Sequence, residues 1–490
     1  MCRNHESSRR DVLRAGVLAL GGLAALVPAT GVRASSRAEG STVVKTFTGR
    51  SGYGFDQWAY VPFDVPAGVR RISVRRTFEA FVVVPGLLSN VLDLGVFGPA
   101  GWEPGAEKGF RGWSGGARGE FALSATEATP GYLPGPIEPG TWAVALGPIV
   151  YNPAGMAWTV EVTLESGPEG PAFVPEPAPV SAKGRGPGWY RGDMHLHTVH
   201  SDGHRTPAEL VAAARARGLD FFASTEHNTR SANLQWGRFA ADDLLIISGE
   251  EVTTRHGHWL AIGLPHDTWI DWRYSPSDGL LPAYARAVRE LGGLVVAAHP
   301  VVPGPGSVWE FGYDHVDAVE VWNGPWTLDD QAAVMVWDGL LREGRRLPAV
   351  GNSDSHSASD VVGLPQTVVH AGGLSRDAVL KAVREGRSYL ADNAGIALHL
   401  TAGTALPGDT VPARTTVECT VTGTPGATLS LFTAAGKVAF ALVPASGSAR
   451  VSWTAAAGAK YVRAEVRSLK PGSTSLTTMA ALSNPIWITG

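Results

Sequence analysis

Cysteine is nearly absent from this 490-residue chain, which contains only Cys2 and Cys419. Because Cys2 lies in an N-terminal segment that we expect to be removed, one thiol would remain, and a disulfide framework is excluded. Charged residues are also scarce, at 18%, and the formal net charge of -4 shows no basic surplus. Nucleic-acid-binding proteins carry such a surplus, so we expect no nucleic-acid partner.

A long apolar run is missing as well. The N-terminal run at residues 15–27 contains glycines and is shorter than the ~20 residues that a membrane-spanning helix needs. It follows a charged start with adjacent Arg9 and Arg10 and precedes small residues, a layout typical of a signal peptide that resembles a twin-arginine export signal. We therefore expect residues 1–34 to be cleaved after Ala34. The twin-arginine machinery would export the protein to a periplasmic or secreted location, with no stable membrane span left.

Glycine and proline, in contrast, are plentiful, with 60 and 34 residues, which suits short strands and turns. Alternating apolar runs predict an N-terminal antiparallel β-sandwich over residues 41–166; these runs lie at 43–47, 71–74, 142–146 and 158–164. Residues 167–188 predict a Pro/Gly-rich linker, and residues 397–490 a C-terminal β-sandwich. The aromatic residues of the first sandwich could form a sugar platform, but we favour core and rim packing; they are Trp58, Tyr60, Trp113, Tyr132 and Trp142.

Residues 189–393 show a different pattern, in which short apolar strands alternate with helical stretches. Seven strands are predicted, at 190–195, 221–224, 244–248, 259–264, 294–298, 318–322 and 348–351. Helices are predicted at 207–217, 280–291 and 328–342, the first with Thr206 as its N-cap and Pro207 in its first turn. This alternation predicts a mainly parallel sheet that closes into a barrel. The predicted fold is multidomain: a central α/β distorted (βα)7 TIM-like barrel between two antiparallel β-sandwich domains.

Histidines and acidic residues follow the predicted strands. His195 and His197 end the first strand, where residues two apart point to the same face and can aim at one metal ion. Asp202, in a turn beside Gly203, could fold back toward the same point. Five further clusters lie at the ends of later strands: Thr225-Glu226-His227-Asn228 and Gly249-Glu250-Glu251 follow the second and third, His258 opens the fourth, Ala298-His299-Pro300 ends the fifth and Ser353-Asp354-Ser355-His356 follows the seventh. Because the carboxyl ends of parallel strands converge, these clusters should gather in one pocket.

The order of these motifs over residues 189–356 resembles the PHP (polymerase and histidinol phosphatase) superfamily of metallohydrolases. The motifs are H-x-H, S-D-G-x-x-x-P, T-[DE]-H-N, G-x-E, A-H-P and S-D-x-H. With an N-terminal β-domain and the segment Gly112-Trp113-Ser114-Gly115, the chain is further similar to the branch named for carbaryl hydrolases. This resemblance implies a distorted seven-stranded PHP barrel and a trinuclear metal site.

The resemblance also implies how the ligands are divided among the metals. By motif position, the first metal is held by His195, His197 and Asp354, the second by His258 and His299 with Glu251 as a bridge from the first, and the third by Asp202, His227 and His356. Nine such ligands without a thiolate suit up to three divalent ions of Zn, Mn or Fe. The G-x-E spacing favours Glu251 over Glu250, and His256 competes with His258. Glu226 stands where many relatives have Asp, and we expect it to hold a ligand imidazole.

The catalytic candidates are Glu251, His200 and Arg255. Clustered divalent ions lower the pKa of a bridging water, so the resemblance implies hydrolysis by a metal-activated hydroxide without a serine nucleophile. His200 is expected to face the substrate or a metal ligand. Arg255, like Arg205 and Asn323, lies near a strand end where it could meet an anionic substrate, although a solvated arginine is the commoner outcome. The remaining histidines are interpreted as structural: His266, His315 and His370.

These expectations describe an exported metal-dependent hydrolase of a small-molecule ester. A phosphoesterase, either a phosphatase or a phosphodiesterase, fits the commonest chemistry of the superfamily. A carbamate or carboxylic ester hydrolase fits the nearer branch and is the alternative. A rival from another class is a cell-envelope or glycan-binding protein that retains the metal site without catalysis. The full set of ligands argues against this rival, because a decayed site should have lost some of them.

Overall fold

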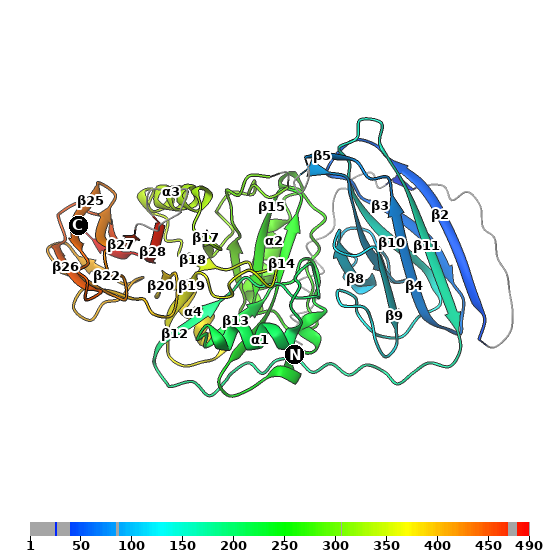
Figure 1. The fold of residues 1–490 in the computed structure, drawn as a ribbon, viewed down its shortest axis with the longest axis horizontal. Helices are drawn as coiled ribbons and strands as arrows, with labels where there is room; N and C mark the ends of the chain where they lie inside the picture. Colours follow the sequence, from blue (N-terminus) through cyan, green and yellow to red (C-terminus); the bar gives the residue numbers. More distant parts are fainter. Residues whose placement is uncertain (1–24, 27–39, 85–87, 305, 469–477, 490) are drawn as a thin grey trace, which may run out of the picture.

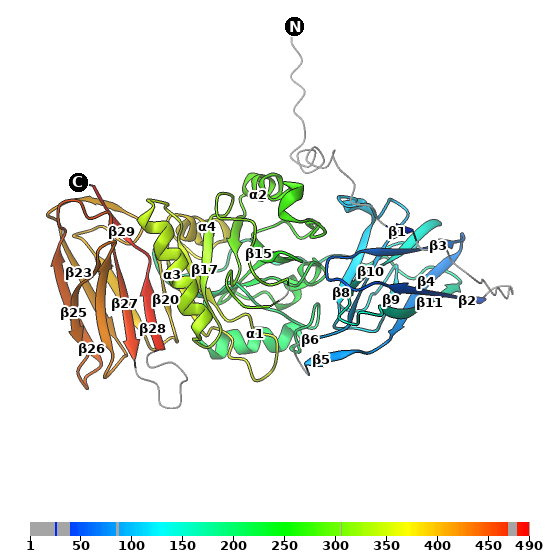
Figure 2. The ribbon, with the colours of Figure 1, turned by 90° about the horizontal axis from the view of Figure 1, so that it is seen from above.

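The computed structural model of this chain describes residues 25–26, 40–84, 88–304, 306–468 and 478–489. These residues form three lobes arranged along the long axis of the molecule, in the order of the sequence (Figures 1 and 2). The predicted signal peptide lies outside the described residues, apart from the two-residue strand β1 (Ala25–Leu26), which pairs with β3. Among the described residues, none of the helices has the length and apolar character needed to cross a membrane.

The N-terminal lobe consists of two sheets that enclose one apolar core. One sheet has the order β1-β3-β10-β7-β8 and the other β2-β11-β4-β9. Side chains alternate along the strands, so that Val160, Val162 and Leu164 of β11 point into the core whereas Glu161 is exposed. The strands are β2 (Thr42–Ser51), β3 (Ala59–Val65), β4 (Val69–Phe78), β5 (Val82–Val84), β6 (Leu88–Ser89), β7 (Val91–Phe97), β8 (Phe110–Gly115), β9 (Glu120–Ser124), β10 (Gly140–Ile149) and β11 (Met156–Ser166). All four predicted apolar runs lie within strands of these sheets.

The central lobe contains all seven predicted strands and all three predicted helices, with small shifts at their ends. The strands are β12 (Gly188–Asp193), β13 (Phe221–Ser224), β14 (Leu245–Thr254), β15 (Gly257–Ile262), β16 (Leu294–Ala297), β17 (Ala318–Asn323) and β18 (Ala349–Asn352). The helices are α1 (Pro207–Ala216), α2 (Leu281–Glu290) and α3 (Leu328–Arg342). Thr206 and Glu209 form a capping box at the start of α1, which fixes where the preceding histidine-rich loop ends.

The prediction of a closed (βα)7 TIM-like barrel needs correction. Strand β15 runs antiparallel to both β14 and β16, and the described chain has no α-helix between β13 and β14, β14 and β15, or β16 and β17. The free edge of β12 is taken by β19 (Gln366–Ala371), so β18 does not pair along β12. A single bridge between Leu196 and Ser355 joins the two ends of the seven-stranded series.

The C-terminal lobe shares its larger sheet with the central lobe. From β19 the strand order continues through β20 (Ser388–Ala391) to β28, β27, β24 and β25. A three-stranded sheet, β21-β23-β26, faces this extension across an apolar core. The elements not yet given are α4 (Arg376–Arg384), β21 (Ala397–Thr401), β22 (Thr410–Pro412), β23 (Thr416–Thr422), β24 (Thr428–Thr433), β25 (Gly436–Leu442), β26 (Ser448–Thr454), β27 (Tyr461–Ser468), β28 (Thr478–Ser483) and β29 (Ile486–Thr489).

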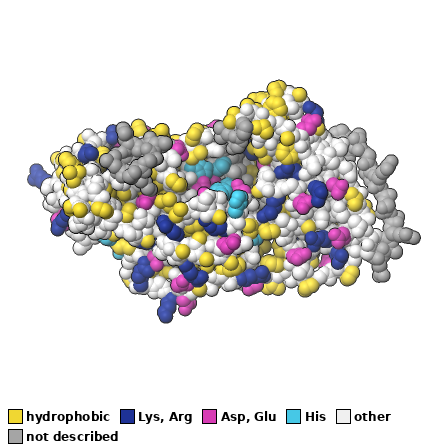
Figure 3. All heavy atoms as spheres, in the orientation of Figure 1, with side chains coloured by type: hydrophobic (Ala, Val, Ile, Leu, Met, Phe, Trp, Pro, Cys, Tyr) yellow, Lys and Arg dark blue, Asp and Glu magenta, His cyan; other side chains and the backbone are white. Residues whose placement is uncertain are grey.

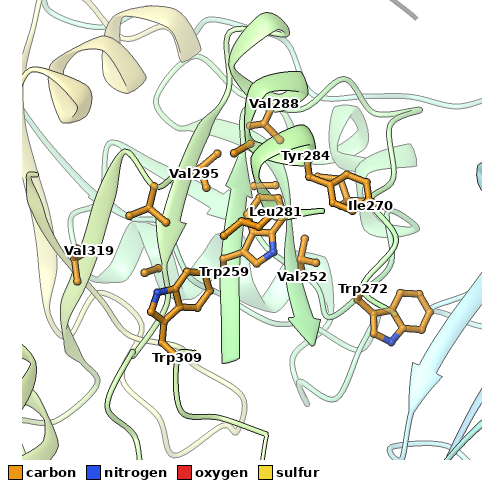
Figure 4. Packing of buried hydrophobic residues seen from close by; sticks show 14 of the residues in the cluster. Val252, Trp259, Ile270, Trp272, Leu281, Tyr284, Val288, Val295, Trp309 and Val319 are labelled. Carbon is orange, nitrogen blue, oxygen red and sulfur yellow. The ribbon is translucent and has the colours of Figure 1, made fainter. Parts of the chain in front are cut away.

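An aromatic contact and the hydrogen bonds of a buried, ion-paired arginine join the N-terminal and central lobes. Trp272 of the central lobe packs on Trp113 of β8, with ring centroids 4.4 Å apart, and Figure 4 shows Trp272 beside a strand of the N-terminal lobe. Arg273 pairs with Asp271 at 2.7 Å and also donates to the Tyr60 hydroxyl and the Trp102 carbonyl. A buried ion pair with all of these partners holds the two lobes in a defined relation.

Replacing Arg273 with methionine tests this contact. The variant keeps most of the side-chain volume but leaves Asp271 buried without its counter-charge, which should lower the free energy of unfolding by about 3–5 kcal/mol. The measurement is urea-induced unfolding followed by tryptophan fluorescence. The matched control is Arg215→Met, whose partner Asp243 is 60% exposed, and which should lose less than about 1 kcal/mol. Equal losses in the two variants would contradict a special role for Arg273.

Candidate metal centre

The nine predicted ligands come together in the central lobe, although they are spread over more than 160 positions of the chain. Seven of them follow a strand of the sheet from β12 to β18, whereas Glu251 lies within β14 and His258 at the start of β15. Their ligand atoms form three adjacent groups: His195, His197, Glu251 and Asp354; Glu251, His258 and His299; and His197, Asp202, His227 and His356. Figure 3 shows histidine and acidic side chains inside a hollow of the molecular surface.

The first group is the most deeply buried. The Nε2 atom of His195 lies 3.1 Å from Glu251 Oε2 and 3.2 Å from Asp354 Oδ1. The Nε2 atom of His197 lies 3.3 Å and 3.0 Å from the same two oxygens. These four atoms are buried, and none of them has a hydrogen-bond partner. Four inward-facing ligand atoms without hydrogen bonds suit a divalent cation. The cation would bind the lone pairs that are not engaged in hydrogen bonds.

The second group uses the other oxygen of Glu251. Its Oε1 atom lies 3.0 Å from His258 Nδ1 and 3.2 Å from His299 Nε2. The competing His256 lies away from this group, since its ring contacts Glu310 at 2.9 Å and Asp56 at 3.3 Å. The structure therefore brings His258, and not His256, to Glu251. The carboxylate faces one group with each oxygen, as a bridging ligand would.

The third group is the most exposed and lies at the mouth of the hollow. Asp202 Oδ1 lies 3.4 Å from His227 Nε2 and 3.3 Å from His356 Nε2. His197 also belongs to this group, and its ring stacks on those of both His227 and His356, with centroids 4.2 Å away in each case. The predicted division of ligands is thus less sharp than expected, because His197 lies between the first and third groups.

The carboxylates of the hollow are stabilised by positive charge close to them. Burial lowers the pKa of His227, but the carboxylates of Glu251 and Asp202 outweigh it and raise that pKa to about 10. For His356, burial is likewise outweighed by Asp202 and Asp354, and its pKa rises to about 9. Burial would raise the pKa of Asp354, yet the neighbouring histidines hold it well below its usual range. Cations bound here would replace those protons, so binding should release protons and weaken in acid.

Two acidic residues missing from the predicted site hold the ligands in place. The buried Glu320 of β17 lies 3.2 Å from His195 Nδ1 and accepts the backbone N–H of His299. The buried Asp193 of β12 accepts from the Ser353 hydroxyl at 2.6 Å and from the Gly363 N–H at 2.8 Å. Burial raises the pKa of Asp193 to about 6. The sequence signal for Glu320 was a carboxylate inside an otherwise apolar run.

Glu226 supports the site differently from the prediction. Its carboxylate accepts from the Ser201 hydroxyl at 2.6 Å and from the Thr198 backbone N–H at 3.1 Å. Ser201 in turn lies 3.4 Å from His197 Nδ1. Glu226 therefore fixes the loop between His197 and Asp202 and reaches the His197 imidazole only through Ser201.

The catalytic candidates other than Glu251 lie outside the three groups. The ring of His200 is engaged on both sides, by the Ser231 hydroxyl at 2.8 Å and by the Gln235 amide, and burial lowers its pKa to about 4. His200 is therefore a neutral group that fixes its loop. Arg255 donates to Asp93 of the N-terminal lobe at 2.6 Å. Arg205 donates to Ser355, and Asn323 donates to Asp354 at 3.2 Å.

Unusual backbone conformations are concentrated at the site. Asn228, His299 and Asp354 have positive φ angles of 55°, 26° and 47°. A non-glycine residue in this region carries strain that its surroundings must outweigh. The Asn228 side chain does so by accepting from the Thr253 N–H at 2.7 Å and donating to the Thr253 carbonyl. Strained backbone conformations therefore occur where the chain turns ligand side chains toward the site.

A cleft of about 300 Å³ opens next to the second and third groups. One side is formed by the ligands Asp202, His227 and His258, and the other by residues of the N-terminal lobe, including Trp113 and Ser114. The Arg255–Asp93 pair crosses between the lobes in the cleft wall. A small molecule bound in this cleft would therefore contact both lobes.

Comparisons with known proteins give one match by sequence family. A family model described as PHP-associated matches residues 341–388, which include β18, β19 and α4. The match marks a similarity to that family over this segment alone. No curated protein matches the chain.

Solved structures give weaker likenesses. A two-domain protein from Bacteroides vulgatus that contains a predicted PHP-like metal-dependent phosphoesterase is 17% identical, covers 64% of this chain and 100% of its own, and has a TM-score of 0.35. A proposed metal-dependent phosphoesterase from Bifidobacterium adolescentis is 19% identical, with coverages of 42% and 96% and a TM-score of 0.27. An amidohydrolase from Chromobacterium violaceum is 18% identical, with coverages of 35% and 89% and a TM-score of 0.27. At such TM-scores these likenesses establish neither a shared fold nor a shared activity.

Replacing Asp202 with asparagine tests the division of the ligands. Asp202 contacts only the third group, so, if each group holds one cation, the variant should lose about one of the three and keep the other two largely bound. Elemental analysis of the purified protein after dialysis measures this. Loss of all metal would show that the three groups do not bind independently.

Replacing Glu320 with glutamine tests the support of His195. The amide keeps the size of the side chain but loses the charge that orients the imidazole, so affinity for the first metal should fall about 10- to 100-fold. A chelator competition titration measures the affinity. Glu310→Gln is the matched control, because Glu310 contacts the non-ligand His256 and is 54% exposed. An unchanged affinity in the Glu320 variant would remove its assigned role.

Proposed function

We propose that the protein is a metal-dependent hydrolase that acts on phosphoesters. The observation that carries the proposal is the convergence of four buried donor atoms without hydrogen bonds around Glu251, whose second oxygen faces two further imidazoles. Such a donor set has no structural use comparable to holding divalent cations. The arginine pair and the apolar run of residues 1–34 further support export through the twin-arginine pathway.

The three groups would hold the cations with imidazole and carboxylate ligands, which suit Zn, Mn or Fe. Divalent ions bound there would lower the pKa of water and stabilise negative charge on the group under attack. The chain itself supplies burial, which strengthens every charge interaction in the hollow. Glu320, Asp193 and Glu226 supply orientation, since they hold His195, the loop of Asp354 and the loop of Asp202.

The side chains of the cleft also indicate where the attacking oxygen comes from. The Ser201 hydroxyl donates to Glu226, and the Thr253 hydroxyl lies 2.6 Å from His227 Nδ1 and 3.3 Å from the Glu251 carbonyl. Cys419 is buried in the core of the C-terminal lobe. Because these hydroxyls and this thiol are occupied or remote, we assign the attack to water and not to a side-chain nucleophile.

The charge around the cleft favours a phosphoryl group. Arg255, the arginine that lines the cleft, is paired with Asp93, so the wall offers little free positive charge of its own. Up to three cations in adjacent groups would instead match the charge of a phosphoryl group and its transition state. A neutral carboxylic or carbamic ester would need less positive charge than this arrangement can hold.

Chelation followed by a substrate screen tests the function. Metal-free protein should be inactive toward aryl phosphate and bis-aryl phosphate, and added Mn or Zn should restore hydrolysis. At metal concentrations of 100 times Kd, the stability should also rise by about 2.7 kcal/mol. The Asp354→Asn variant should remain inactive with metal, whereas Glu310→Gln should be as active as the wild type. Metal-restored hydrolysis of an aryl carboxylic ester alone would overturn the phosphoester assignment, and full activity after chelation would overturn the metal assignment.

A further inference from the structure

The third group of ligands draws two of its members from loops. Asp202 lies in residues 198–203, here called the Asp202 loop, and His227 in residues 227–231, here called the His227 loop; the loops follow β12 and β13. The side chains of Asp202 and His227 are 45% and 20% exposed, whereas that of Glu251 is fully buried. Ligands on loops near solvent keep their geometry only when neighbouring elements support them.

One support comes from Arg118, which lies between β8 and β9 of the N-terminal lobe. Figures 1 and 2 show β8 on the side of this lobe that faces the central lobe. The Arg118 guanidinium group donates to the backbone carbonyl of Val199, three residues before Asp202. Glu226 holds the same loop from the central lobe, because its carboxylate accepts from the Ser201 hydroxyl at 2.6 Å. The Asp202 loop is therefore held between one residue of each lobe.

A second support comes from Gly131, which follows β9 in the N-terminal lobe. The Gly131 N–H donates to Ser231 Oγ at 3.1 Å, and the Gly131 carbonyl accepts from the Thr229 hydroxyl at 2.8 Å, two residues after His227. Gly131 has a φ angle of +100°, and a Cβ atom at this position would lie only 3.1 Å from the His200 carbonyl oxygen. Glycine therefore lets the backbone of the N-terminal lobe approach both loops closely.

A third support passes through Trp269 of the central lobe. Its ring stacks on that of Phe110 in β8, with centroids 4.0 Å apart. The same indole donates its Nε1–H to the Asn228 carbonyl at 3.0 Å, in the His227 loop. An offset or stacked aromatic pair of this kind adds to the stability that burial alone gives. The N-terminal lobe thus reaches the His227 loop through Gly131 directly and through one buried ring.

We infer that the N-terminal lobe positions the ligands of the third group, with Arg118 as the residue that fixes the Asp202 loop. The His200 ring lies 2.8 Å from the Ser231 hydroxyl and so joins the two loops to each other. The first group has its support inside the central lobe, where Glu320 holds a ligand imidazole. The inference rests on the metal centre of the proposed function, and it gives the N-terminal lobe a part in holding one cation.

Arg118→Met tests the inference in the full-length protein loaded with Mn or Zn. The variant keeps an unbranched side chain but cannot donate to Val199. If each group holds one cation, the affinity for one of the three should fall about tenfold, and the other two affinities should stay as in the wild type. A chelator competition titration measures them. Arg118→Lys keeps a charged donor and should restore part of the loss. The matched control is Arg75→Met, because Arg75 of the same lobe is 67% exposed and pairs with Glu120.

Amide hydrogen exchange gives a second readout that needs neither metal nor turnover. The N–H groups of Val199 and Ser201 form local backbone hydrogen bonds, and in Arg118→Met they should exchange about tenfold faster than in the wild type. Amides of β12 and β14 should exchange at the wild-type rate. Thr229→Val removes the hydroxyl that donates to Gly131 and should speed up exchange in the His227 loop in the same way.

Three results would overturn the inference. The first is an Arg118→Met protein whose Asp202 loop exchanges as in the wild type, or whose metal affinities are all unchanged. The second is an equal loss of affinity in Arg75→Met. The third is exchange that becomes faster throughout the chain, because Arg118 would then serve general stability. Wild-type protein that binds no metal would instead contradict the proposed hydrolase, and the exchange rates would still decide whether Arg118 holds the loop.

Discussion

The carboxylate of Glu251 is the constraint on which the site depends. It is fully buried, and each of its oxygens faces a different group of imidazoles. A buried carboxylate costs several kcal/mol unless positive charge compensates it. The histidines can supply that charge only as protonated groups, whereas divalent cations can supply it while the histidines stay neutral. The rigidity of β14, paired on both sides, keeps this carboxylate from turning out to water.

Rigid support extends outward from this residue through a second set of buried acids. Glu320 and Asp193 hold His195 and the loop of Asp354, and both lie inside strands and not in loops. Placing these supports on strands is consistent with ligand geometry that must be held closely. The strained backbone at His299 and Asp354 shows the same requirement, because φ angles that cost energy persist only where neighbouring contacts impose them.

The N-terminal lobe forms part of the site. Its Trp113 and Asp93 form one side of the cleft, and it is held against the central lobe by the Trp113–Trp272 contact and by the hydrogen bonds of Arg273 to Tyr60 and Trp102. Residues that belong to none of the three ligand groups therefore form part of the cleft wall beside them.

Local patterns allowed the sequence alone to predict the strands and the helices, and the family resemblance of its motifs pointed to the nine residues that gather at the site. An H-x-H on a strand, an N-cap at Thr206 and a polar cluster after an apolar run depend on residues close together in the chain. Only the tertiary structure decided what depends on distant pairing. The pairing of β12 with β19 left the expected barrel closed by a single bridge, and His197 came to lie between two groups. The roles of Glu320 and Arg255 were likewise hidden, because a lone charged residue in a strand or turn acquires its meaning from a partner more than 100 residues away.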